Sequence, residues 1–203
     1  MALNIPYLFE SNFETGLTTE WDSEVDTGSL LNVRHYSVVS KMDATRVGPI
    51  APWRGAFVAE WLLGDTNDHT LIKATSPVIA DTKTGFSQFM LFIGKNLTAT
   101  ADNVFSILEL QGTANAQESV VALKITAATG AIQIGVAQTQ AGIVFAGEAL
   151  PRGRWIVIEL VTTVVVGTAT GTSTLFVDGT QFGATVTHAA VNTPVLRAVL
   201  GTQ

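Results

Sequence analysis

Hydrophobic and polar positions alternate along this chain in short runs, and turn-forming residues close each run. Runs rich in Val, Ile, Thr and aromatic residues, with every second position apolar, are typical of β-strands. Gly, Pro and Asp-Gly or Thr-Gly pairs between them favour turns. No stretch keeps the helical period over several turns, so the sequence predicts an all-β protein. The expected strands cover residues 30–40, 56–63, 70–74, 86–94, 104–111, 119–126, 131–137, 143–145, 154–165, 173–177, 180–186 and 195–200.

Two hairpins stand out in this pattern. The pair Asp178-Gly179 separates two apolar runs, and Asp-Gly favours a type I′ turn because both central residues of that turn need positive φ. The alternating runs 120–125 and 131–136 flank a short Thr/Gly loop and predict a second hairpin. Many short strands joined in this way are typical of a β-sandwich or barrel.

Length and composition indicate one self-sufficient domain. The 203 residues contain no repeat, no linker and no break in composition, so we expect a single domain over residues 1–203, with residues 1–15 as an N-terminal arm or first strand. A chain of this length buries enough surface to form its own core. It has no cysteine, which excludes disulfides, thiolate metal sites and a cysteine nucleophile.

Charge is sparse and unevenly placed. Charged residues make up 14% of the chain, against about 25% in an average domain. This deficit fits a surface covered by other subunits, and it equally fits an ordinary β protein rich in Thr, Ala and Gly. From Trp155 onward only Glu159, Asp178 and Arg197 are charged, so we expect the C-terminal third to form central strands or a contact surface. The net charge of −6 disfavours nucleic acid as a partner.

Membrane insertion and secretion lack a sequence signal. The best apolar run, residues 155–161, is short and is interrupted by Glu159, whereas a membrane span needs about 20 apolar residues. The N-terminus has no basic region followed by a long apolar stretch, so we expect no signal peptide and no membrane partner.

Several segments resemble one known superfamily. Residues 9–16 followed by Trp21, residues 52–58, LPRGRWIVIE at 150–159 and GTSTLFVDG at 171–179 are similar to segments of concanavalin A-like jelly rolls of the laminin G-like type. The resemblance implies an antiparallel jelly-roll β-sandwich, and a scaffold of this kind does not by itself imply an activity. Such domains close with a strand beside the first one; because the chain stops at Gln203, we expect that strand to be absent or to be supplied by another molecule.

One acidic motif resembles a catalytic motif of the same superfamily. Glu20, Asp22 and Glu24 match the E-x-D-x-E pattern of its β-glucanase branch, and spacing by two would place the three carboxylates on one face of a strand. In that branch the motif lies on a central strand well into the chain. Here it follows the first turn, so we interpret it as a solvated acidic loop and predict no enzyme and no catalytic residues.

Metal and nucleophile motifs are weak. Asp65, Asn67 and Asp68 offer oxygen ligands for calcium, but the same run is typical of an Asx-rich turn, which is the interpretation that we favour; no other cofactor is expected. The three histidines lack zinc spacing, and there is no G-x-S-x-G elbow and no phosphate loop.

Aromatic residues provide the candidate binding positions. Trp53 lies between Pro52 and Arg54 in an expected loop and is the better candidate for a glycan-stacking platform, followed by Trp21. Trp61 and Trp155 lie in apolar strands, so we expect them in the core.

Three functions therefore remain open from the sequence. The main hypothesis is a structural protein of a virion surface, a capsid decoration or tail-associated subunit, that contacts copies of itself or capsid and tail proteins. An N-terminal arm with Ile5, Tyr7 and Phe9 would supply assembly contacts, and the location would be a virion or an extracellular surface. The alternative is a lectin-like module that binds a cell-surface glycan. A hydrolase of the β-glucanase type is the least favoured.

Overall fold

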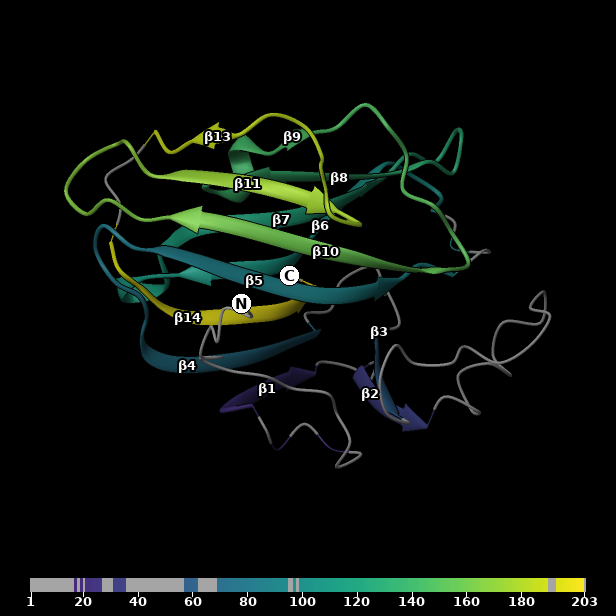
Figure 1. The fold of residues 1–203 in the computed structure, drawn as a ribbon. Coiled ribbons are helices and arrows are strands. Elements are labelled where there is room, and N and C mark those ends of the chain that lie inside the picture. Colours follow the sequence, from purple (N-terminus) through teal and green to yellow (C-terminus); the bar gives the residue numbers. More distant parts are fainter. Residues whose placement is uncertain are drawn as a thin grey trace, which may run out of the picture.

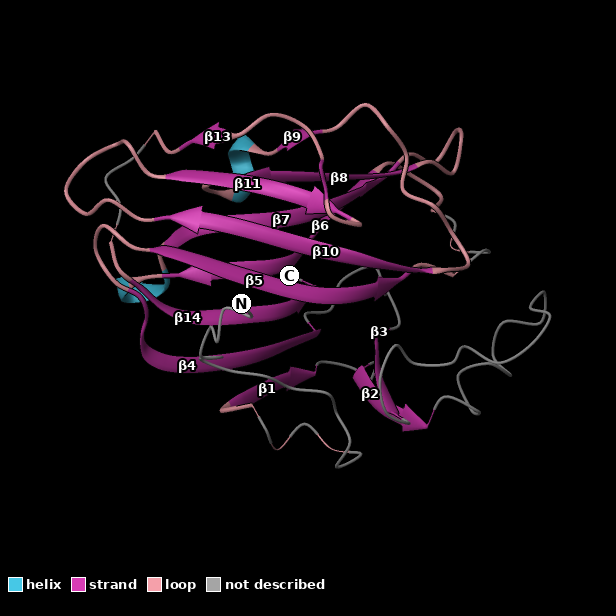
Figure 2. Ribbon diagram, in the orientation of Figure 1, coloured by secondary structure: helices cyan, strands magenta, loops and turns pink. Residues whose placement is uncertain are grey.

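Strands dominate the molecule and are arranged in layers. The computed structural model describes residues 17, 19, 21–26, 31–35, 57–61, 69–94, 97, 99–189 and 193–202. Within these residues two antiparallel sheets stack face to face (Figure 1). The helices of this part of the chain are two short 3₁₀ turns, η1 (Thr113–Asn115) and η2 (Gln140–Gly142), shown in cyan in Figure 2. No helix among the described residues is long and apolar enough to cross a membrane.

The larger sheet has seven strands in the order β1-β4-β14-β6-β7-β8-β9. Their bounds are β1 Ser23–Asp26, β4 His69–Ile79, β14 Val195–Thr202, β6 Asn103–Gln111, β7 Gln117–Ile125, β8 Ile132–Ala137 and β9 Val144–Phe145. The C-terminal strand β14 therefore lies between β4 and β6, inside the sheet. It does not pair with β1 in the described residues, so a closing strand that is absent or supplied by another molecule stays a prediction.

The smaller sheet has the order β12-β11-β10-β5, with β13 also paired to β11. Its strands are β5 Thr84–Phe92, β10 Trp155–Thr163, β11 Thr172–Val177, β12 Thr180–Gln181 and β13 Val186–Thr187. A separate antiparallel pair joins β2 (Leu31–His35) and β3 (Phe57–Trp61). The long C-terminal strands β10 and β14 are both interior, as the sparse charge of that third of the chain predicted.

The core fills the space between the two sheets. Alternation along β10 places Ile156, Ile158 and Leu160 in the core with no exposed surface, and the larger sheet contributes residues such as Val121 and Ile134. A polar link crosses this core: the hydroxyl oxygens of Ser119 on β7 and Ser173 on β11 lie 2.8 Å apart, and Ser173 Oγ lies 2.8 Å from the Nε2 atom of the buried His188. Buried hydroxyls need such partners, because an unpaired one costs stability.

Both predicted hairpins are confirmed. Asp178 (φ 50°) and Gly179 (φ 76°) both have positive φ between β11 and β12, as a type I′ turn requires. The strands β7 and β8 pair from Val120 with Ala137 to Ile125 with Ile132. The strand expected over 180–186 is instead two short pieces, β12 and β13, separated by Gly183 with φ 81°.

Other expectations need correction. The outward side chains of β10, including Trp155 and Val157, are half-buried. Trp155 thus lies outside the core, with its ring 5.4 Å from that of Phe92 in an edge-to-face contact. The sequence pattern did not predict β1. The strand β4 is longer than expected and continues through Pro77 to Ile79, where the pairing with β14 is irregular. Proline lacks an N–H, so a strand contains it where pairing is interrupted.

Candidate functional site

A groove of about 730 Å³ lies on the face of the larger sheet that points away from the smaller sheet. It is next to the turn η1, and it receives side chains from the strands β4, β14, β6 and β7 and from the segment after β8. Its lining residues are Ile72, Glu109, Gln111, Asn115, Ala116, Gln117, Glu118, Gln138, Thr139, Thr193, Arg197 and Val199.

Strand alternation places the polar residues of β6 in this groove. Leu108 and Leu110 belong to the core, so Glu109 and Gln111 point to the opposite face. The register between β6 and β7 shifts after Leu110, which faces Ser119, to Gln111, which faces Gln117. Such an irregularity re-aims side chains at the end of a pair of strands, and here Glu118 joins the residues that line the groove.

Glu109 is fixed by two hydrogen bonds. The Ser106 hydroxyl donates to Oε1 over 3.0 Å and the Gln111 amide donates to Oε2 over 2.9 Å. Glu109 is only 2% exposed. Both carboxylate oxygens therefore have partners, as a buried carboxylate requires, and the bond from Gln111 fixes the orientation of that amide at the groove.

Glu118 is held at one oxygen only. The Thr193 backbone N–H and the Thr193 hydroxyl both donate to Oε1, over 2.9 and 2.6 Å. Glu118 is 1% exposed and its Oε2 has no hydrogen-bond partner. A Cβ at Gly112 would lie 2.0 Å from the Thr193 hydroxyl, so glycine is needed there for Thr193 to reach the carboxylate.

Arg197 supplies the positive charge of the groove. Its Nη1 donates to Oδ1 of Asn115, a residue with φ 64°, in the left-handed region that asparagine tolerates better than most residues. Its Nε is buried and has no hydrogen-bond partner. Arg197 forms no ion pair with any carboxylate in the described part of the chain.

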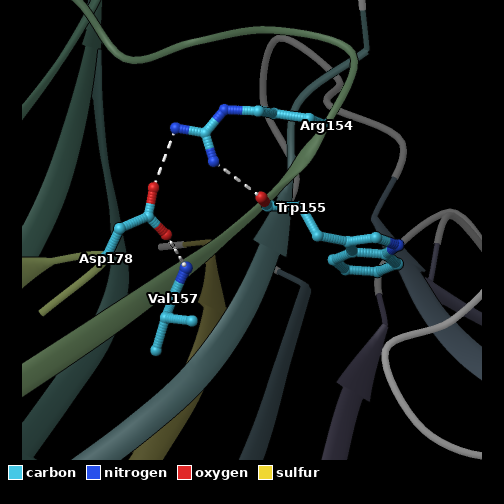
Figure 3. A network of polar contacts seen from close by, with 4 residues as sticks. All are labelled: Arg154, Trp155, Val157 and Asp178. Atoms are coloured by element: carbon cyan, nitrogen blue, oxygen red, sulfur yellow. Dashed lines mark hydrogen bonds and ion pairs between the residues drawn. The ribbon is translucent and has the colours of Figure 1, made fainter.

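A second polar network lies on the smaller sheet and stabilises a turn (Figure 3). Asp178 accepts a hydrogen bond from the Val157 N–H over 2.9 Å and from Nη2 of Arg154 over 2.8 Å, and Nη1 of Arg154 donates to the Trp155 carbonyl. The Val157 bond first, and then Arg154, lower the pKa of Asp178 below its ordinary value of 3.8. These bonds are local to β10 and the β11–β12 turn, so we assign them a structural role.

Most of the site residues predicted from sequence lie outside the described residues. These are Trp53, the calcium candidates Asp65, Asn67 and Asp68, and the arm residues Ile5, Tyr7 and Phe9. Trp21 is half-buried, just before β1; the N–H of the next residue, Asp22, donates to the carbonyl of Ile72 at the groove. Trp21 is not itself a lining residue.

The acidic motif lies partly before β1 and partly in it: Asp22 lies in a bend, Glu24 lies in the strand, and Glu20 lies outside the described residues. Asp22 and Glu24 are exposed, and Glu24 belongs to β1, at the end of the larger sheet. Neither carboxylate lines the groove. The described residues contain no cluster of three His, Asp or Glu side chains that could hold a metal ion.

Sequence reasoning missed the residues that form the groove. Glu109 and Gln111 end an otherwise apolar strand, and Arg197 is one of three charges in the C-terminal third. A charged side chain inside an apolar run is an informative signal, because such residues are rarely buried without a partner. That signal marks the residues singly; it does not show that they lie together.

Comparisons with known proteins identify the fold. No family model and no curated protein matches the chain. Among solved structures, an endo-β-1,4-glucuronan lyase from Trichoderma reesei is similar over 90% of this chain and 79% of its own, with a TM-score of 0.55 and 12% identity. An alginate lyase from Alteromonas (TM-score 0.44, 14% identity, 68% and 60% covered) and a galectin from Caenorhabditis elegans (0.38, 13%, 65% and 86%) also match.

The chain therefore has a concanavalin A-like jelly-roll fold, with two antiparallel sheets forming a sandwich. Its candidate site is the polar groove on the outward face of the larger sheet.

Proposed function

We propose that the protein is a non-catalytic glycan-binding module that holds its ligand in the groove of the larger sheet. The observation that carries this proposal is the chemistry of the lining. Amide, carboxylate and guanidinium groups surround apolar positions at Ile72, Ala116 and Val199. Sugar rings present hydroxyl groups at their edges and C–H groups on their faces, so a groove that combines both kinds of surface matches them.

The fold is compatible with this role. The glucuronan lyase that shares it acts, by its name, on a polysaccharide. We favour binding without turnover because a general base needs a matching acid. The described lining residues include no His, Tyr or Lys; Glu118 has one oxygen without a partner, but Glu109 is already bonded at both carboxylate oxygens.

A bulky substitution in the groove tests the proposal. Ala116 is exposed and lines the groove, so Ala116→Trp should fill it without disturbing the core. We expect glycan binding to fall at least about tenfold, a loss of about 1.4 kcal/mol, in calorimetric titrations with oligosaccharides that bind the unmodified protein. The matched control is Ala169→Trp, at an exposed position in the loop between β10 and β11 that is not among the lining residues, which should bind normally. Equal binding by both variants, or no glycan ligand at all, would contradict the proposal.

A second candidate, self-assembly, is favoured by the outward face of the smaller sheet. Phe86 on β5 is 71% exposed, and it pairs across the strands with Val161. Met90 and Val157 form another apolar pair on this face. Among the paired positions of β5 and β10 on this face the charged residue is Glu159, which accepts a hydrogen bond from Gln88 over 2.9 Å; the exposed Arg154–Asp178 ion pair lies at the start of β10. We propose a second copy of this chain as the occupant, because two such faces meet with little charge repulsion despite the net charge of −6.

The oligomeric state tests this second candidate. Phe86→Asp should convert a dimer to a monomer in light scattering after size exclusion, since it places a charge in the contact. Val144→Asp is the matched control, because Val144 is 63% exposed on the larger sheet and should leave the dimer intact. A protein that remains monomeric at high concentration would rule this candidate out. The virion role and location expected from the sequence stay predictions.

A further inference from the structure

We propose that the groove selects an uncharged glycan and rejects acidic polysaccharides, with Glu118 accepting a hydrogen bond from one sugar hydroxyl and Arg197 donating to another. This inference rests on the proposed glycan-binding function and adds the chemical class of the ligand. It is carried by two unpartnered atoms and by the balance of charge in the groove.

The two unpartnered atoms are complementary in kind. Oε2 of Glu118 is a buried acceptor without a donor, and Nε of Arg197 is a buried donor without an acceptor. Both residues line the same groove. Buried polar groups without partners are rare in folded proteins, and a ligand group is one partner that would satisfy them.

A hydroxyl-rich ligand satisfies both atoms at once. A hydroxyl group donates one hydrogen bond and accepts others, so one ligand hydroxyl can donate to Glu118 while a neighbouring hydroxyl accepts from Arg197. Hydrogen bonds in which one partner is charged are also stronger than neutral ones. A simple cation would pair with Glu118 alone, and a simple anion would pair with Arg197 alone.

Charge in the groove opposes an acidic ligand. The lining contains two carboxylates, Glu109 and Glu118, and one guanidinium, that of Arg197. Both carboxylates are almost fully buried, where charges are weakly screened. A uronate sugar would bring further negative charge to this site, and the net charge of −6 would slow the approach of an acidic polymer.

The first experiment compares ligands on the unmodified protein. The probes are hexasaccharides of neutral sugars (cello-, manno- and laminarihexaose) and hexamers of glucuronan and alginate, titrated by calorimetry at low and high salt. We expect at least one neutral hexamer to bind at least about tenfold more tightly than either acidic hexamer. Its affinity should change little with salt, whereas any weak binding of the acidic hexamers should improve as salt screens the repulsion.

The second experiment changes one groove charge without changing its shape. In Glu118→Gln the amide oxygen can still accept both bonds from Thr193, while an NH₂ group replaces the unpartnered acceptor. We expect neutral-glycan affinity to fall about three- to tenfold and acidic-glycan affinity to rise at least about threefold. A residue with a purely structural role would not move the two affinities in opposite directions. The charge-matched control is Glu148→Gln, an exposed position outside this groove.

Removing the positive charge gives a different pattern. Arg197→Gln should weaken both kinds of ligand, because it removes a donor and leaves both carboxylates in place. Lys83→Gln, at an exposed turn position, is the control and should change neither affinity by more than about twofold. Thermal unfolding of each variant shows whether its fold is retained.

The outcomes separate this inference from the proposed function. Tighter binding of glucuronan or alginate than of every neutral hexamer, or neutral binding that is unchanged in both Glu118→Gln and Arg197→Gln, would overturn the inference and leave glycan binding intact. Failure of every hexamer to bind would overturn the proposed function and the inference with it.

Discussion

At the scale of single residues, Asp178 shows how one side chain secures a turn. It adopts positive φ in the type I′ turn, which Asp tolerates better than most residues. From that position its carboxylate reaches the start of β10, where it accepts bonds from the Val157 N–H and from Arg154. The turn between β11 and β12 is thereby fixed to the neighbouring strand.

This carboxylate should make stability depend on pH. The native pKa of Asp178 is lowered from 3.8, chiefly by the Val157 hydrogen bond, so the carboxylate stabilises the fold above the unfolded pKa and the contribution is lost as the pH falls through the native pKa. Asp178→Asn should therefore cost about 1 kcal/mol or less at pH 7, because Arg154 and Asp178 are well exposed. The difference from the unmodified protein should disappear in strong acid. Urea unfolding at several pH values measures it.

The control for this prediction separates the two partners of Asp178. Arg154→Gln removes the ion pair but keeps the Val157 bond, so its loss of stability at neutral pH should be smaller than that of Asp178→Ala. A destabilisation by Asp178→Asn that is the same at neutral and acidic pH would show that the carboxylate charge does not contribute.

At the scale of elements, the edge strand β9 packs closely against one glycine of its neighbour β8. The short strand β9 pairs with β8 at Gly135 and Val136. A Cβ on Gly135 would lie 2.7 Å from both the Val144 carbonyl oxygen and Cγ2 of Ile143. Any side chain at this position would displace β9, so glycine is required by packing.

A pair of glycine substitutions tests this packing. Gly135→Ala should lower the free energy of unfolding by about 1–3 kcal/mol, because a methyl group is forced against backbone and side-chain atoms. Gly147→Ala is the control, since nothing lies within 4 Å of a Cβ there, and it should leave stability within about 0.5 kcal/mol of the unmodified protein. Denaturant unfolding compares the two; equal stabilities would mean that β9 moves aside at little cost.

At the scale of the whole molecule, the two outward faces of the sandwich differ in chemistry. The larger sheet presents a polar groove with Glu109, Glu118 and Arg197, whereas the smaller sheet presents apolar side chains around the exposed Phe86. A glycan and a second copy of the chain would use different faces, so the two proposed functions are compatible in one molecule. The buried Ser119–Ser173–His188 link connects the two sheets behind these faces.

The sequence could predict little of the groove on the larger sheet, and the reason is physical. Alternation marks which residues of one strand share a face, but the pairing of β6 with β14 joins residues far apart in the chain, such as Glu109 with Val199. No local pattern reports that pairing. The register between β6 and β7 is irregular beside Glu118, which lines the groove. This irregularity likewise depends on contacts between strands.

The sequence alone determined the all-β class, the positions of most strands along the chain and the two hairpins. Period-two alternation and Asp-Gly turn chemistry act over a few neighbouring residues. Tertiary structure decided the rest. The groove forms because β14 is inserted between β4 and β6 and because Thr193 bonds to Glu118. The face of β10 that is enclosed is likewise set by the sheet that packs against it. Those outcomes follow from long-range contacts, which local residue patterns do not encode.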